Sequence, residues 1–106
     1  MLNDMFGLFN NASKEKLAKI VRKKYKKEWD KSLRLCIKGA KQKANNGYQF
    51  FIIDSKVVHC PHNKGRPFED VLNDIRKRFK GCDVNVDNTY GKTDIKVSWN
   101  IDRGNI

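Results

Sequence analysis

The residues of this sequence best suited to chemistry are the lysines and arginines of its first half. Segment 14–43 holds 13 of them and three acidic residues, whereas the rest of the chain holds ten basic and nine acidic residues. Nearly all of the net charge of +11 therefore lies in one segment. A positive field of this kind speeds encounters with polyanions and with acidic surfaces. The sequence thus predicts an anionic partner.

Aromatic residues lie among these cations, with Tyr25 inside the run 22–27 and Trp29 just beyond it. Lysine neutralises phosphates as a point charge, and an aromatic ring can stack on a nucleic-acid base. Both rings also occupy apolar positions of the segment, which favours packing in the core. If the rings are in the core, the cations alone remain for binding, and their contacts would depend little on base sequence. An acidic protein surface could bind these cations equally well. The expected contact residues are Lys19, Arg22, Lys23, Lys26 and Lys27.

A second, smaller basic group, Lys64-Gly65-Arg66, precedes Pro67 at the start of an expected helix. The first turn of a helix carries unpaired N–H groups and a partial positive charge, so it attracts phosphates. Lys64 and Arg66 are therefore a second candidate anion site. The glycine spacing and the Lys-Ser/Thr pair of a P-loop are absent, and an ordinary surface turn would account for the same residues.

The run His59-Cys60-Pro61-His62 holds side chains that can bind zinc or pair as nucleophile and base. Zinc sites usually draw their ligands from two closely spaced pairs, and the second pair is missing here. No orienting group or oxyanion loop accompanies a Cys-His pair. A loop is the plainer interpretation, so neither a metal nor a cofactor is predicted.

Segment 83–87 alternates acidic or amide residues with Val84 and Val86. This alternation is typical of a strand, and the glycine and glutamate of a calcium loop are absent. No pair of catalytic carboxylates, serine motif or cofactor fingerprint occurs elsewhere in the sequence. We therefore expect a protein that is not an enzyme.

The basic segment has the periodicity of a helix. Ser13 suits its N-cap, Glu15 suits its first turn, and Asn45, Asn46 and Gly47 would end it. A helix over 12–46 would extend about 50 Å, more than a compact domain of this size needs. It must bend or split, or its first half projects and packs on another chain, which would make the protein a homo-oligomer. Steps of three and four predict a single apolar stripe, formed by Leu17, Ile20, Val21, Tyr25, Trp29, Leu33, Cys36, Ile37, Ala40 and Ala44.

The remaining pattern predicts a strand or hairpin over 48–59, a helix over 67–80 and a β-hairpin over 82–101. The continuous apolar run 48–53 predicts a strand buried on both faces, and Lys56 to His59 would pair back on it. This order indicates an α+β fold, in which a long N-terminal helix and a second helix pack on a small antiparallel sheet of three to four strands. Residues 12–106 are expected to form one domain.

Residues 1–11 form a short apolar segment with helical spacing. A helix of this length is marginal alone, so we expect it to dock on its own domain, on a second copy or on a partner. Packing within the protein is favoured. The docking residues would be Leu2, Met5, Phe6 and Phe9.

The sequence also bears on the compartment. It has no run of about 20 apolar residues, so no membrane span and no membrane partner are expected. The N-terminal segment contains Asp4 and lacks a basic lead, unlike a secretory signal. Its three cysteines are an odd number without regular spacing, which argues against a disulfide framework. A cytoplasmic location follows.

The stretch 33–100 resembles a type of small accessory protein encoded by tailed phages. The shared pattern is a helix ending near Ala44 and Gly47, a strand, a second helix ending at Gly81, and a hairpin that closes on Ile95-Lys96-Val97-Ser98-Trp99-Asn100. The Lys- and Asn-rich composition is similar to that of phages with AT-rich genomes. The resemblance implies a host-takeover or anti-defence protein acting in the infected cell. It supplies no catalytic residues.

These observations lead to one functional hypothesis with two alternatives. The first is a non-enzymatic phage-type protein that binds an anionic partner, with nucleic acid favoured, through its basic helix. The second is an inhibitor that docks on an acidic host protein, such as a defence, replication or transcription factor. The third is an oligomeric sponge that sequesters an anionic cyclic nucleotide, with Arg66 in the pocket.

Overall fold

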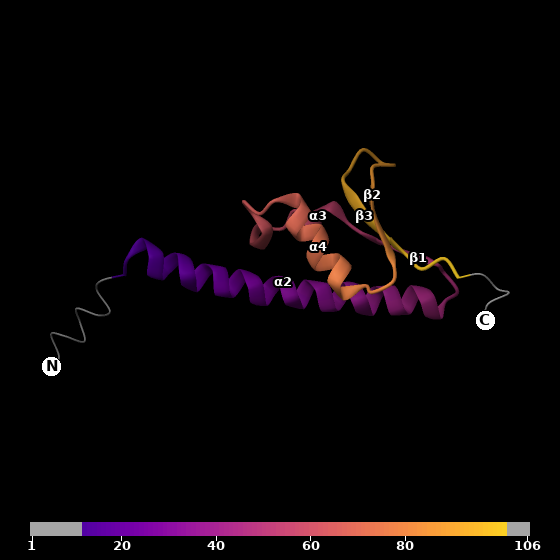
Figure 1. Cartoon of the computed structure of the whole chain (residues 1–106), viewed down its shortest axis with the longest axis horizontal. Helices are drawn as coiled ribbons and strands as arrows, with labels where there is room; N and C mark the ends of the chain where they lie inside the picture. The colour runs from indigo at the N-terminus through magenta and orange to yellow at the C-terminus, as the bar shows by residue number, and fades with distance from the viewer. Residues whose placement is uncertain (1–11, 102–106) are drawn as a thin grey trace.

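A computed structural model describes residues 12–101 of the chain, which form a long helix carrying a small α+β layer (Figure 1). Helix α2, Lys14–Asn45, is unbroken over 32 residues. Its N-cap is Ser13, whose hydroxyl accepts a hydrogen bond of 3.2 Å from the backbone N–H of Lys16. At about 1.5 Å per residue the helix extends about 48 Å. The expected alternative of a bent or split helix is therefore wrong.

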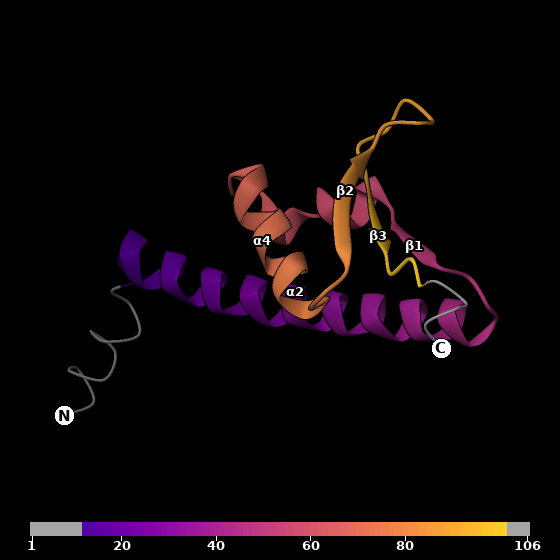
Figure 2. The same cartoon turned by 45° about the vertical axis from the view of Figure 1, so that its right-hand side comes forward.

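The first half of α2 projects beyond the other elements, which gather over its second half (Figure 1, Figure 2). All of its residues from 14 to 27 are exposed except Ala18, which is half-buried. Trp29 and Leu33, by contrast, are 4% and 2% exposed. The single apolar stripe predicted for this helix is thus wrong in its first half.

Two features explain this difference: the other elements do not cover the first turns of the helix, and the apolar stripe winds around it. Each residue of an α-helix is rotated by about 100° from the one before it. Residues four apart are therefore offset by about 40° around the helix axis, and this offset accumulates along the series. Leu17, Val21, Tyr25, Trp29 and Leu33 form such a series. Because the last two face the domain, the first two have turned well away from it and are 51% and 44% exposed.

The sheet has three antiparallel strands in the order β1-β3-β2. The strands are β1, Phe50–Ile53, β2, Asp83–Asp87, and β3, Asp94–Ser98. Strands β2 and β3 form the predicted hairpin, with Val84 opposite Val97. The side chains on one face of the sheet pack against the helices, where α2 contacts β1 and α4, Phe68–Arg78, contacts β2. The α+β class and the small antiparallel sheet are confirmed.

Strand β1 lies at an edge of the sheet, and its residues Phe50, Phe51 and Ile52 are exposed or only half-buried, so the prediction of burial on both of its faces is wrong. The buried central strand is β3. Phe50 is 41% exposed and packs under Lys96, whose ammonium lies 4.9 Å from the ring centroid. Phe51 turns inward against Gly39 of α2, where an added Cβ would lie 2.8 Å from the ring.

The segment after β1 is helical, which corrects the prediction of a second strand over 56–59. Asp54 caps helix α3, Ser55–Val58, by accepting a hydrogen bond of 2.8 Å from the backbone N–H of Lys56. The carboxylate of Asp94 on β3 accepts a bond of 2.8 Å from the backbone N–H of Ser55. These two carboxylates satisfy the first N–H groups of α3 and fix it beside the sheet.

The hydrophobic core lies between the second half of α2, helix α4 and the inner face of the sheet. The most deeply buried large side chains include Leu33, Ile53, Ile75 and Ile95. A short 3-10 helix, η1, Pro61–Asn63, connects α3 to α4 and contacts α2. No helix in the described part of the chain is long and apolar enough to cross a bilayer.

Candidate functional site

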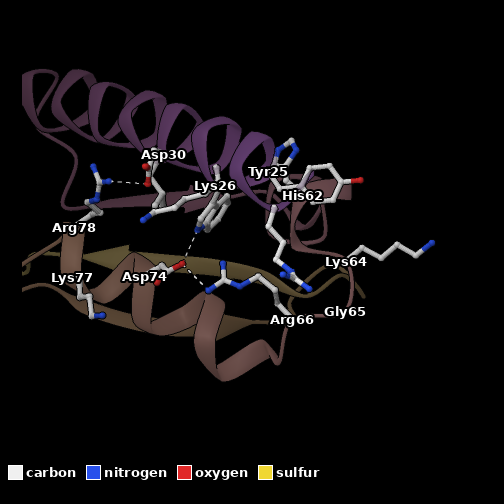
Figure 3. A pocket seen from close by; sticks show the side chains of 13 residues that line it. Tyr25, Lys26, Asp30, His62, Lys64, Gly65, Arg66, Asp74, Lys77 and Arg78 are labelled. Atoms are coloured by element: carbon white, nitrogen blue, oxygen red, sulfur yellow. Dashed lines mark hydrogen bonds and ion pairs between the residues drawn. The ribbon is translucent and has the colours of Figure 1, made fainter. Parts of the chain in front are cut away.

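A cleft opens between α2 and α4 and is bounded by η1 and the loop that follows it (Figure 3). Its volume is about 660 Å³, within the range of sites that hold small organic ligands. Three separate parts of the chain contribute to its walls. The lining residues are Arg22, Tyr25, Lys26, Trp29, Asp30, Leu33, His62, Lys64, Gly65, Arg66, Asp74, Lys77 and Arg78.

The cleft is strongly cationic, since six of its lining residues are Lys or Arg and two are Asp. Both carboxylates are already engaged. Asp74 forms an ion pair of 2.9 Å with Arg66, and Asp30 forms one of 3.1 Å with Arg78. The other four cations have no ion-pair partner within residues 12–101, and these are Arg22, Lys26, Lys64 and Lys77. The cleft therefore presents unneutralised positive charge to a ligand.

The walls of the cleft are joined by one carboxylate oxygen. Oδ2 of Asp74 on α4 accepts a hydrogen bond of 2.9 Å from the indole N–H of Trp29 on α2, and it also pairs with Arg66. Asn63, which is buried, braces the same guanidinium by accepting a bond of 3.2 Å from Nη1 of Arg66. Its own amide donates a bond of 3.0 Å to the carbonyl oxygen of Val58. These bonds hold Arg66 in one orientation at the edge of the cleft.

One wall carries two aromatic rings, from Tyr25 of α2 and His62 of η1. Their centroids lie 6.3 Å apart with an interplanar angle of 57°, so the rings are tilted and not stacked on each other. Figure 3 shows them side by side, with Lys64 extending beyond them. Tyr25 is 37% exposed, so the prediction that it packs in the core is wrong. The same prediction for Trp29 is confirmed.

The structure brings together residues of the two candidate anion sites that the sequence indicated separately. Arg22 and Lys26 of α2 face Lys64 and Arg66 across one cleft. The other predicted contact residues lie on α2 outside the cleft, and they are Lys19, Lys23 and Lys27. The predicted docking residues Leu2, Met5, Phe6 and Phe9 lie outside the described residues.

No protein family, curated protein or solved structure matches this chain.

Several residues of the cleft were not predicted from the sequence. Lys77 and Arg78 follow Asp74 by three and four residues, so the helical spacing of α4 places all three on one side. That spacing was visible in the sequence. The pairing of Tyr25 with His62 had no sequence signal, because it depends on how η1 packs on α2.

The histidines flanking Cys60 do not converge on a common site. His59 stacks on Phe68, with centroids 6.1 Å apart and planes inclined by 23°, whereas His62 lies beside Tyr25. Within residues 12–101 no group of three or more His, Cys, Asp or Glu side chains could hold a metal ion. The chemistry that this cleft offers is recognition of negative charge and of an aromatic or planar group.

Proposed function

We propose that the protein binds nucleic acid without catalysing a reaction, through the cationic cleft and the adjoining side of α2. The observation that supports this most directly is the convergence of Arg22, Lys26 and Lys64, from distant parts of the chain, around one concave surface. Like charges repel unless a counter-charge lies between them, and phosphates supply that counter-charge.

The positive surface continues from the cleft along α2. Lys19 lies three residues before Arg22, so it extends the cleft side of the helix toward its N-terminus. A strand of nucleic acid lying on this side would meet successive cations over several nucleotides. The length and exposure of the first half of α2 thus suit a polymer as the partner.

The aromatic rings beside the cations favour nucleic acid over an acidic protein. An acidic surface would need only positive charge, whereas Tyr25 and His62 add planar groups that can contact bases. The role in phage takeover of a host or in evasion of its defences, implied by the resemblance described above, stays a prediction.

The test is a binding titration by fluorescence anisotropy at salt concentrations from about 50 to 200 mM. Phosphate contacts predict that the logarithm of the affinity falls linearly with the logarithm of the salt concentration, by about 0.7 to 0.9 per phosphate neutralised. Undetectable binding, or an affinity independent of salt, would contradict the proposal. Capture of an acidic protein from a nuclease-treated lysate, with no binding to nucleic acid, would favour the inhibitor hypothesis instead.

A matched pair of double variants separates the cleft from general positive charge. Arg22→Glu with Lys26→Glu reverses two cations of the cleft. Lys31→Glu with Lys38→Glu reverses two exposed cations of α2 outside the cleft, with the same change in net charge. We expect the first pair to abolish binding and the second to weaken it only modestly. Equal losses in both would show that net charge alone drives association.

A further inference from the structure

We propose that the cleft takes one unpaired nucleotide, with its base against Tyr25 and His62 and its phosphates between Arg22, Lys26 and Lys64. This inference rests on the proposed function and specifies its ligand: nucleic acid in single-stranded form, or a free nucleotide with the same chemistry. A duplex would then bind only through its phosphates.

The aromatic wall can accept a base. The two rings are tilted by 57° with their centroids 6.3 Å apart, so they do not use up each other's faces by stacking. Tyr25 is 37% exposed although it occupies a position of the apolar series, and it is one of the residues that line the cleft. Stacking on an exposed ring tolerates any base, because every base has a π-face.

The polar edges of the same rings are also available. Within residues 12–101, neither the hydroxyl of Tyr25 nor a ring nitrogen of His62 takes part in a hydrogen bond with another protein group. By contrast, Trp29 in the same cleft is committed to Asp74. Tyr25 and His62 can therefore both stack on a base and hydrogen-bond its edge, whereas Trp29 has a structural role.

The cations lie on both sides of these rings. Arg22 and Lys26 come from the turns of α2 next to Tyr25, and Lys64 comes from the loop two residues after His62. A nucleotide bound at the rings would place its phosphates between the two groups. The volume of about 660 Å³ accommodates a ligand of this size.

A duplex cannot present this combination. Its bases are paired and stacked inside the helix, and extracting one is energetically unfavourable. The phosphates of a duplex could lie on α2, but no base would reach the rings inside the cleft. The geometry therefore predicts a preference for single strands, which simple positive charge would not produce.

The experiment is a competition between matched oligonucleotides of about 12 nucleotides, a length that one small domain can cover. The arms are a single strand, its duplex, and the same single strand with abasic sites in place of its bases. We expect the single strand to bind at least about fivefold tighter than either competitor at equal salt, since a stacked base contributes about 1–3 kcal/mol. Comparable affinity for all three would overturn the inference while leaving the proposed function intact.

Variants of Tyr25 test whether the preference for single strands depends on the cleft. Tyr25→Leu keeps apolar bulk without an aromatic face, and we expect it to lower single-strand affinity about 5- to 100-fold and to leave duplex affinity unchanged. Tyr25→Phe should retain most of the preference. Far-ultraviolet circular dichroism verifies that both variants are folded. An unchanged preference in the folded Tyr25→Leu variant would overturn the inference.

Calorimetry distinguishes the source of the nucleotide. Nucleoside diphosphates and cyclic dinucleotides contain a base and phosphates but lack the rest of the strand. If a free nucleotide binds as tightly as the oligonucleotide, and if Tyr25→Leu abolishes this binding, the result would support the cleft site with a free nucleotide as its ligand. Absence of binding to every oligonucleotide and every nucleotide would overturn both this inference and the proposed function.

Discussion

The indole Nε1 of Trp29 donates a hydrogen bond of 2.9 Å to Oδ2 of Asp74, which lies 45 residues further along the chain. The same oxygen pairs with Arg66 at 2.9 Å. One carboxylate thus joins the long helix to α4 and orients a cation at the edge of the cleft. We therefore expect Asp74 to affect both the stability of the fold and the proposed binding of nucleic acid.

Asp74→Ala should therefore destabilise the fold. Trp29 is 4% exposed, and removal of its acceptor leaves the indole N–H of this buried residue without its protein partner. We expect a loss of about 1–3 kcal/mol in the free energy of unfolding, measured by urea denaturation. Asp74→Asn should lose less, because an amide oxygen can still accept the indole hydrogen.

The control for this prediction is Asp30→Ala, which breaks the other ion pair of the cleft. The side chains of Asp30 and Arg78 are 40% and 37% exposed, so solvent screens their attraction. The expected loss is at most about 1 kcal/mol. A larger loss for Asp30→Ala than for Asp74→Ala would show that the Trp29 hydrogen bond does not hold the helices together.

Two leucines of α2 provide a second test, since they share chemistry and helix but differ in burial. Leu33 is 2% exposed and Leu35 is 60% exposed. Leu33→Ala should cost about 2–5 kcal/mol in the free energy of unfolding, because it leaves a cavity between α2 and the rest of the core. Leu35→Ala should change it by no more than about 0.5 kcal/mol. Comparable losses would mean that Leu35 is covered in solution, for example by a second copy of the chain.

Much of this fold was predictable from local pattern. Ser13 and Asn46 flank the long helix as caps, the alternation in 83–87 matches β2, and Trp29 and Leu33 lie in the core. Each of these features depends on residues close together in sequence. Periodicity, capping chemistry and alternation are local signals, so they remain readable without the tertiary structure.

The predictions that were wrong concern features that depend on tertiary context. Lys56 to His59 was predicted to form a strand, but the carboxylates of Asp54 and Asp94 cap a helical turn there. Asp94 belongs to β3, far along the chain from that turn. Tyr25 was predicted to pack in the core because it continues a series of apolar residues four apart. Successive members of such a series are displaced around the helix, so they do not all face the domain. Residues of a cleft assembled from three chain segments cannot be grouped from sequence spacing.

Thr89 lowers the pKa of Asp87 below its ordinary value, because its hydroxyl and its backbone N–H both donate hydrogen bonds to the carboxylate. A pKa lowered in the folded state stabilises the fold above the unfolded pKa, and that stabilisation is lost as the pH falls through the folded pKa. Thr89→Ala should raise the pKa of Asp87 part of the way to its ordinary value, measured by NMR titration, because the hydroxyl bond is lost and the backbone N–H bond remains. Thr93→Ala in the same hairpin should leave it unchanged, and an equal rise in both variants would contradict the assignment.

Burial raises the pKa of the Cys36 thiol, which lies in the core among α2 residues. The thiolate is the reactive form, so both burial and the raised pKa slow its modification. In the native protein we expect Ellman's reagent to label Cys60 and Cys82, which are half-buried, well before Cys36. Mass spectrometry of the labelled peptides gives the order. Early labelling of Cys36 would indicate that α2 separates from the core on the timescale of the reaction.

Adjacent lysines of α2 offer the finest test of where the ligand lies. Lys26 lines the cleft, and Lys27 lies about 100° further around the helix. Both are exposed cations, so substitution by alanine changes net charge equally. We expect Lys26→Ala to weaken binding to nucleic acid and to reduce the salt slope by about 1, because one phosphate contact is lost. Lys27→Ala should leave both nearly unchanged in the same anisotropy titration. A larger effect at Lys27 would place the ligand on the flank of α2 outside the cleft, and the aromatic wall would then have no part in binding.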